Sequence, residues 1–398
     1  MAVAGPGLVV MLADTDAGSV ITAAQSGAQW GYRLLALQLV LVPILFIVQE
    51  LTVRLGIVTG HGHGDLIRQH FGHRWAWLSV GTLLVACLGA LLSELGGLAG
   101  VGMMYGVPAW VTMAVVVLGL TAMAWTGSYL SVERIAMLLG AFELVFIVVA
   151  WKAQPSTAEM ARTVLDMPLQ DPKYLYLISA NIGAVIMPWM VFYQQSAVVE
   201  KNLGVDDLAA ARWDTAFGAL LTQVIMAVVL VATAATLERA HSHASLDTVQ
   251  QIAQAITPFL GERTGRLLFG MGMSGAALVA TIVVTLTAAR ALGEVLGYRH
   301  SLENTPREAP WFYAIYTGAL LLAGSVVASG ANLVKLGVGV QVMNALLLPI
   351  VLGFLYLLAR RLPRTYRLKG VYAGIVAVVI LVTVVLGVYA GVAGIYAA

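Results

Sequence analysis

The sequence predicts an all-α membrane protein that forms a single helical domain over residues 1–398. Of its residues, 60% are hydrophobic and only 11% are charged. Apolar runs repeatedly exceed the roughly 18 to 20 residues that a helix needs to cross a bilayer. Polar residues gather in the segments between these runs, whereas a soluble chain of this length would more often divide into two domains with polar surfaces.

Windowed apolarity predicts eleven membrane-spanning helices. They cover residues 5–27, 34–58, 76–104, 108–127, 130–151, 174–199, 213–237, 266–296, 311–328, 332–359 and 371–396. The longest connections follow the fifth and the seventh of these helices, at 152–173 and 238–263. The second of them contains an amphipathic piece, 246–260, which we expect to form a short helix at the membrane surface.

The distribution of basic residues predicts how these helices are oriented. If the N-terminus is cytoplasmic, the cytoplasmic connections contain the dense run Arg360, Arg361, Arg364, Arg367 and Lys369. The short connections on the other side then contain only Arg33 and Lys335. Because short cytoplasmic loops are enriched in Lys and Arg, we expect a cytoplasmic N-terminus and an extracellular C-terminus in the plasma membrane.

Two of the predicted helices contain residues that interrupt an α-helix. The first carries 14–19 (DTDAGS) and the sixth carries 181–188 (NIGAVIMP). These helices are five apart and cross in opposite directions, which is typical of an inverted repeat whose broken helices form a binding site at the midplane. We therefore expect repeat one at about 5–151, repeat two at about 174–359 and an extra helix at about 371–396. The alternative is that Gly and Pro merely kink these helices.

Asp14 and Asp16 place two carboxylates in an apolar segment. Each costs about 2.5 to 3.5 kcal/mol near the centre of a membrane helix, so at least one requires a partner. Unwinding at Gly18 would free backbone carbonyls and make a bound cation the natural partner. Asp14 is the weaker candidate, because its side chain can face the other side of the chain. Pairing with Arg290, capping of a half-helix and a role in a proton relay stay open.

Other potential ligands lie on later helices. Met187 offers a soft thioether, and Ala184 offers a carbonyl where Pro188 disrupts the hydrogen-bond ladder. Gln341 is an isolated amide in an apolar helix, with Asn344 one turn later. Such residues also serve as core packing or as ties between helices.

Several other functions and sites are disfavoured. The net charge of +2 is spread over many loops, so we expect no nucleic-acid partner. Cys87 is the only cysteine and is read as a small buried hydrophobe. The segment 61–65 (HGHGD), with His70 and His73, has metal-ligand residue types, but its glycines indicate a turn and Asp65 is placed to cap a short helix.

These motifs resemble those of the NRAMP divalent-metal transporters. That family carries Asp-Pro-Gly-Asn on its first helix and Ala-x-x-Met-Pro-His-Asn on its sixth, where this chain has 16–19 (DAGS) and 184–190 (AVIMPWM). The resemblance extends over most of the chain. Further matching segments are 5–7 (GPG), 26–33 (SGAQWGYR), 54–60 (RLGIVTG) and Gln341 followed by Leu348 and Pro349.

The resemblance implies a LeuT-like fold, with five helices, five inverted helices and one extra helix, that moves a divalent cation by alternating access. It assigns Asp16, the carbonyl of Ala184, Met187 and Gln341 to the positions of the family's metal ligands. Ser19 replaces the family's Asn ligand with a shorter hydroxyl. The ion is then a substrate, and no cofactor or enzymatic activity is expected.

Two departures from the family concern protons. The family's histidine after Met-Pro is Trp189 here, and a second histidine further along the helix is Gln194. Without these imidazoles, the usual proton acceptors near pH 7 are missing, although Glu94 on the third helix could substitute. These departures resemble the prokaryotic NRAMP-related magnesium transporters. Mg²⁺ retains several waters and favours a roomy oxygen-lined pocket, whereas the Met187 thioether favours softer ions such as Mn²⁺.

The leading hypothesis is therefore a secondary carrier of Mg²⁺ first and Mn²⁺ second, without proton coupling. One alternative is a proton-coupled Mn²⁺/Fe²⁺ importer that uses Asp14 or Glu94. A sodium-coupled amino-acid carrier and a non-transporting membrane receptor are less favoured. No Walker A motif is present, which disfavours a primary pump. The expected partners are the metal ion and the lipid bilayer, and the sequence does not indicate an oligomeric state.

Overall fold

The computed structural model describes the chain except for residues 1–4, 127–128, 240–244, 258–259, 331 and 398. Helices make up most of this described part, and no strand occurs in it. The α-helices are α1 (Pro6–Asp14), α2 (Ala17–Trp30), α3 (Leu35–Thr59), α4 (His63–Phe71), α5 (His73–Met104), α6 (Ala109–Thr126), α7 (Tyr129–Gly140), α8 (Val145–Ala153), α9 (Thr157–Thr163), α10 (Pro172–Val185), α11 (Pro188–Glu200), α12 (Leu208–Arg239), α13 (Val249–Ile256), α14 (Glu262–Leu296), α15 (Pro310–Ala328), α16 (Leu333–Ala359) and α17 (Gly370–Ala397). Three short 3₁₀ turns are η1 (Gly31–Leu34), η2 (Ala141–Leu144) and η3 (Val205–Asp207).

Within the described residues, ten helical stretches are long and apolar enough to cross a membrane. The first of them, Ala17–Thr59, joins α2, η1 and α3 into one stretch. The short helix α1 precedes it, so α1 and α2 together occupy the first predicted helix. The predicted all-α membrane architecture is confirmed, while the count of eleven crossings stays a prediction.

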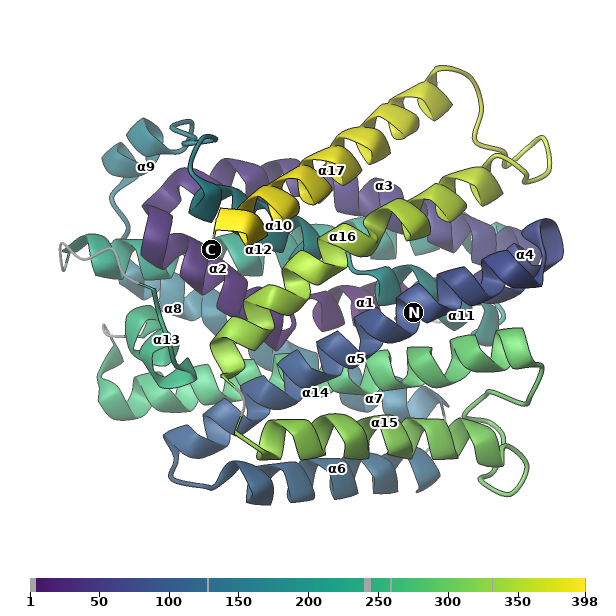
Figure 1. Cartoon of the computed structure of the whole chain (residues 1–398), viewed down its shortest axis with the longest axis horizontal. Helices are drawn as coiled ribbons and strands as arrows, with labels where there is room; N and C mark the ends of the chain where they lie inside the picture. Colours follow the sequence, from purple (N-terminus) through teal and green to yellow (C-terminus); the bar gives the residue numbers. More distant parts are fainter. Residues whose placement is uncertain (1–4, 127–128, 240–244, 258–259, 331, 398) are drawn as a thin grey trace.

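The longer helices run side by side along the long axis of the molecule (Figure 1). The broken pair α10 and α11 is almost entirely buried, whereas α6 and α17 expose much of their apolar surface. α10 packs against α16 and α17, α2 packs against α12 and α16, and α5 packs against α14. The interrupted helices are therefore shielded from lipid by the uninterrupted ones.

Both predicted helix breaks occur, and local chemistry explains where each new helix begins. Asp16 is the N-cap of α2, with extended backbone, and its carboxylate accepts a hydrogen bond from the amide of Ser19. Met187 is the extended N-cap of α11, and Pro188 occupies the first helical turn. Proline fits there because it has no N–H to donate and its φ angle suits a helix. The residues that interrupt one helix thus start the next.

One further interruption is absent from the sequence prediction. The fifth predicted helix is divided into α7, the 3₁₀ turn η2 and α8. The sequence has no Gly-Pro pair or charged cluster that would predict this turn. The turn places Glu143 in the protein interior, where its side chain is fully buried.

The connection between α12 and α14 forms the short helix α13, as its amphipathic pattern predicts. Gln25 of α2 holds the residues just before it: the Gln25 amide donates to the carbonyl of Leu246, and the amide of Leu246 donates to Gln25 Oε1 at 3.2 Å. This paired contact fixes the connection against α2.

Candidate metal-binding site

The two helix breaks meet in the interior. Ser19 Oγ of α2 donates a hydrogen bond to the carbonyl oxygen of Ala184 in α10 at 3.0 Å, although 165 residues separate them in sequence. Both residues are buried. This contact brings together one residue from each of the two motifs on which the site prediction depends.

Asp16 lies at this meeting point with its side chain fully buried. Its Oδ1 accepts from the amide of Ser19 at 2.6 Å and from Gln341 Nε2 of α16 at 3.4 Å. Its Oδ2 has no hydrogen-bond partner in the described part of the chain. A buried carboxylate oxygen without a donor is costly, so this atom is suited to accept a cation.

Gln341 reaches Asp16 because Gly18 has no side chain. A Cβ atom at position 18 would lie 2.3 Å from Gln341 Nε2 and 2.6 Å from Ser93 Oγ. The oxygen of the Gln341 amide accepts from Asn344 Nδ2 at 2.9 Å. Gln341 therefore presents its nitrogen to Asp16, and a cation at this point would require the amide to rotate before its oxygen could serve as a ligand.

Met187 is fully buried at the start of α11, and its sulfur accepts a hydrogen bond from Trp189 Nε1 at 3.2 Å. The Trp189 indole is thus directed at the thioether. Because an indole N–H only donates, Trp189 can neither ligate a cation nor accept a proton through this nitrogen.

Glu94 of α5 approaches the same break from the other side. Its Oε2 accepts from the amide of Ala17 at 2.9 Å, and its Oε1 has no hydrogen-bond partner among the described residues. The Glu94 and Asp16 carboxyl groups are close enough to interact. Two neighbouring buried carboxyl groups repel each other when both are ionised, which a bound cation or a proton would relieve.

Asp14 lies at the last residue of α1 with its side chain buried. It interacts with Thr222 of α12, which also shares a hydrogen bond with Thr15 at 2.5 Å. Its Oδ1 has no partner in the described structure. The side chains of the two aspartates at the break therefore interact with different hydrogen-bonding groups, Asp14 with Thr222 and Asp16 with Ser19 and Gln341.

Glu143 is a buried acid that the sequence analysis overlooked. Its polar neighbours are Thr15, Asp14 and Asp16, yet neither of its carboxyl oxygens has a hydrogen-bond partner in the described residues. The signal was present in the sequence, since an acid in the middle of the span 130–151 carries the same cost as Asp14.

Two other expectations concern residues further from the break. Gln194 lies within α11, and its Nε2 donates to Thr215 Oγ1 at 2.9 Å, so it ties α11 to α12. The suggested pairing of Arg290 with the aspartates is wrong, because Arg290 forms an ion pair with Glu200 instead. The alternative that an aspartate caps a half-helix is confirmed, because Asp16 is the N-cap of α2.

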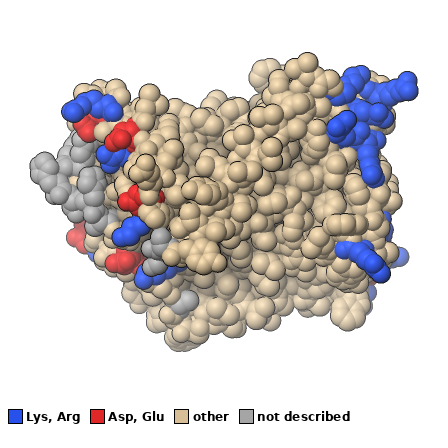
Figure 2. All heavy atoms as spheres, turned by 45° about the horizontal axis from the view of Figure 1, so that its top comes forward, with Lys and Arg blue, Asp and Glu red and all other residues tan. Residues whose placement is uncertain are grey.

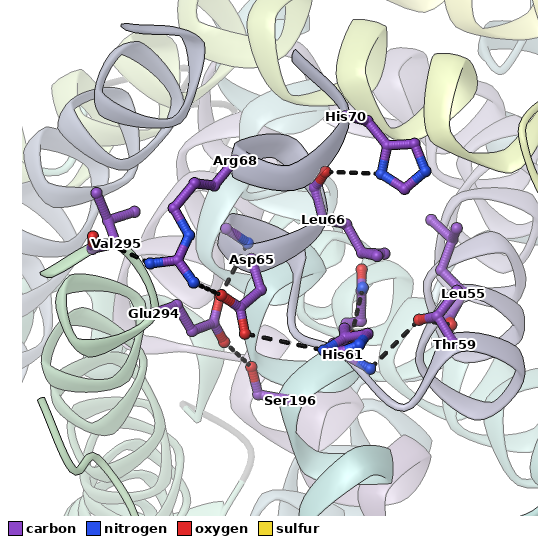
Figure 3. Close-up of polar contacts among 12 residues, drawn as sticks. Leu55, Thr59, His61, Asp65, Leu66, Arg68, His70, Ser196, Glu294 and Val295 are labelled. Carbon is purple, nitrogen blue, oxygen red and sulfur yellow. Dashed lines mark hydrogen bonds and ion pairs between the residues drawn. The ribbon is translucent and has the colours of Figure 1, made fainter. Parts of the chain in front are cut away.

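The histidine-rich segment does not gather its side chains around one point (Figure 3). His61 Nδ1 lies 4.0 Å from Asp65 Oδ2, while His70 Nδ1 contacts the carbonyl of Leu66 at 3.0 Å. In the described residues, no three His, Cys, Asp or Glu side chains converge enough to hold a metal ion. The predicted cap at Asp65 is wrong, because α4 begins at His63 with Gly62 as its N-cap. Asp65 instead pairs with Arg68 at 2.6 Å one turn later.

This segment instead fastens the connection between α3 and α5 to the rest of the protein (Figure 3). Glu294 of α14 accepts hydrogen bonds from the amide of Gly64 at 2.8 Å and from Ser196 Oγ of α11 at 3.0 Å. A pocket of about 370 Å³ lies beside these residues. One carboxylate thus joins three elements at the end of the molecule opposite α13.

His63 in this connection gives a pH-dependent contribution to stability. It is fully buried between the membrane-spanning stretches, with Nδ1 2.9 Å from Gln195 Oε1, and burial lowers its pKa from 6.5 to about 4. Between these values the unfolded chain binds a proton that the folded protein does not, so stability falls as the pH falls. The loss should approach roughly 3 kcal/mol below pH 4.

We expect His63→Asn to flatten the decline of the melting temperature between pH 7 and pH 5, measured by thermal unfolding. His61→Asn is the matched control because its side chain is 48% exposed. A decline in His63→Asn as steep as in the parent protein would contradict this assignment.

Comparison with known proteins identifies the family of this chain. A family model described as natural resistance-associated macrophage protein-like (Nramp) matches residues 7–393. The chain belongs to the Nramp family. Curated relatives in this family include a divalent metal cation transporter, MntH, of Klebsiella pneumoniae, which is 25% identical over 72% of this chain and 70% of its own length. MntH of Xylella fastidiosa strain Temecula1 is 26% identical over 82% of this chain and 70% of its own length.

Solved structures confirm the fold of this Nramp chain. A manganese transporter of Eremococcus coleocola superposes with a TM-score of 0.77 at 18% identity, over 99% of this chain and 87% of that one. MhsT in complex with L-phenylalanine superposes with a TM-score of 0.63 at 14% identity, over 98% of each chain. The predicted LeuT-like fold is thus confirmed, and the relatives are named as transporters rather than enzymes.

Proposed function

We propose that this Nramp protein is a secondary transporter that carries Mg²⁺ and Mn²⁺ across the plasma membrane by alternating access, without coupling to protons. The observation that carries the proposal is the buried Asp16 carboxylate, which has one unpartnered oxygen at the point where both broken helices meet. The printed names of the relatives, divalent metal cation transporter and manganese transporter, support the substrate class.

The ligands proposed for the ion are the Asp16 carboxylate, the Ala184 carbonyl, the Met187 sulfur, the Gln341 oxygen and the Ser19 hydroxyl, with Asp14 as a further candidate. Ser19 donates a hydrogen bond to the Ala184 carbonyl, and Trp189 donates one to the Met187 sulfur. An arriving ion must compete with both contacts. A hydrated ion needs to displace fewer of these hydrogen bonds, because its bound waters can bond to the same groups. This supports Mg²⁺, which retains several waters, as a substrate.

The absence of imidazole at positions 189 and 194 supports uncoupled transport, since Trp189 donates to sulfur and Gln194 donates to a threonine. An inward-negative potential would suffice to drive uptake. Two charges moving through 100 mV gain about 4.6 kcal/mol, which corresponds to more than a thousandfold concentration ratio. Glu94 beside Asp16 favours the alternative of a proton-coupled Mn²⁺ or Fe²⁺ importer.

Alternating access requires that the two ends open in turn. We propose that the Gln25–Leu246 contact closes the outer end and that Glu294, through Gly64 and Ser196, closes the inner end. The proposed orientation places the arginine-rich connection between α16 and α17 in the cytoplasm. The proposed organisation is one transmembrane domain, with repeats at about 5–151 and 174–359 and an extra helix at about 371–396.

A flux assay on purified protein in liposomes tests the function. We expect inside-negative potential to accelerate uptake of Mg²⁺ and Mn²⁺ more than uptake of Ca²⁺, with no acidification of the lumen when metal enters. Acidification driven by metal would instead support the proton-coupled alternative. Failure of both Mg²⁺ and Mn²⁺ to move would contradict the proposal as a whole.

A further inference from the structure

An apolar groove opens on the outside of the helical domain, between the first turns of α5 and the last turns of α16. Its volume is about 350 Å³, and its lining includes Phe71, Trp75, Leu78, Pro349, Phe354 and Leu357. Trp75, Leu78 and Leu357 are 45 to 52% exposed. Because this part of α5 and α16 belongs to stretches that are long and apolar enough to cross a membrane, we expect the groove to face lipid.

A glycine keeps the groove open. A Cβ atom at Gly353 would meet no other atom within 4 Å, so the space beside it is empty of protein. Pro349, one helical turn earlier on the same face of α16, also lines the groove. The volume and the apolar lining of the groove suit part of one acyl chain, and Trp75 in that lining is a residue type that is enriched at membrane interfaces.

Arginine side chains lie at the end of the groove that is next to the connection between α16 and α17. The guanidinium of Arg361 lies 4.2 Å from the centre of the Phe71 ring and donates to the carbonyl of His70 at 3.0 Å. Arg360 and Arg74 are exposed at the same end. The Arg361 side chain is therefore held at the groove rather than directed freely into water.

Among the described residues, no acid forms an ion pair with this group of basic residues. Residues 360–369 contain five Lys or Arg and no Asp or Glu. The ion pairs seen in the described part of the chain include none from these residues or from Arg74. Figure 2 shows Lys and Arg gathered at one end of the molecule without Asp or Glu beside them in that view.

We propose that this groove is a binding site for an anionic phospholipid of the leaflet at the arginine-rich end. One acyl chain lies between α5 and α16, and the headgroup phosphate contacts Arg360 and Arg361. The preference for basic residues in cytoplasmic loops explains the charges, but it does not explain the apolar groove directly beside them. Basic sites between membrane helices bind anionic headgroups, and a guanidinium matches phosphate with two parallel hydrogen bonds.

Binding of phosphatidylglycerol and of phosphatidylcholine to the purified full chain, quantified by native mass spectrometry, tests this proposal. We expect the parent protein to prefer phosphatidylglycerol. The double variant Arg360→Gln/Arg361→Gln should lower that affinity about 30-fold, from roughly 1 kcal/mol for each arginine. It should weaken binding of phosphatidylcholine less, because the choline group offsets the charge of the phosphate, so the preference for phosphatidylglycerol should decrease. Gly353→Leu, which fills the groove, should weaken binding of both lipids.

Gly318→Leu is the matched control, because a Cβ at Gly318 of α15 also meets no atom within 4 Å and the position lies outside the groove. Melting temperatures of all variants establish that they are folded. The proposal is overturned if Gly353→Leu binds phosphatidylglycerol like the parent protein, or if Gly318→Leu weakens it equally. If Gly353→Leu does not fold, an unchanged lipid preference in the arginine variant overturns the proposal.

Discussion

Asp16→Asn is expected to lower the initial rate of Mn²⁺ uptake into proteoliposomes about 100-fold or more, with little change in melting temperature. The change removes a buried carboxylate charge at the junction of α2 and α10 that contacts Gln341 and has one oxygen without a hydrogen-bond partner among the described residues. Mutation of a residue that only supports a metal ligand commonly lowers metal affinity or activity about 10- to 100-fold. Loss of a charged ligand should lower them at least as much.

Asp16→Asn distinguishes a metal ligand from a helix cap. Asn caps a helix about as well as Asp, so the bond from the Ser19 amide is retained. Asp16→Ala removes both the cap and the charge. It should lower the free energy of unfolding by roughly 1 kcal/mol more than Asp16→Asn does, and the two variants should lower Mn²⁺ uptake to a similar extent. Normal Mn²⁺ uptake by Asp16→Asn would mean that Asp16 acts only as a cap.

Gly183→Ala is expected to prevent the protein from reaching its native packing. A Cβ at position 183 would lie 1.8 Å from the backbone oxygen of Gln341 and 2.7 Å from the amide of Ala345. Backbone atoms cannot rotate away as a side chain can, so α10 and α16 must separate. We expect a loss of about 3 kcal/mol or more, at the upper end of the usual cost of overpacking, seen as a lower melting temperature and a smaller monodisperse fraction.

Gly353→Ala is the control for this effect. It makes the same chemical change on α16, where the added methyl group meets no atom within 4 Å. Since Ala favours a helix over Gly by about 1 kcal/mol, this variant should be at least as stable as the parent protein. Equal melting temperatures for Gly183→Ala and Gly353→Ala would show that the α10–α16 contact tolerates an added methyl group.

Local residue patterns account for the parts of the fold that the sequence predicted correctly. The break at Asp16 and the break before Pro188 are visible in sequence because a cap and a proline act on their own helix. The turn η2 was missed because no such residue marks it. The predicted cap at Asp65 is wrong because the residue type suits an N-cap, whereas the N-cap of α4 is Gly62, three residues earlier.

The sequence by itself determined the apolar helices, the two breaks and the motifs that mark the Nramp family, because these depend on residues close together in the chain. The family resemblance predicted which residues share the site, but only the tertiary structure decided which atoms meet at the breaks. Ser19 reaches Ala184, Glu94 reaches Ala17, and Gln341 reaches Asp16 past Gly18. It also assigned Arg290 to Glu200 and placed Glu143 beside Asp14. These pairings depend on how distant helices pack, and no single segment encodes that packing.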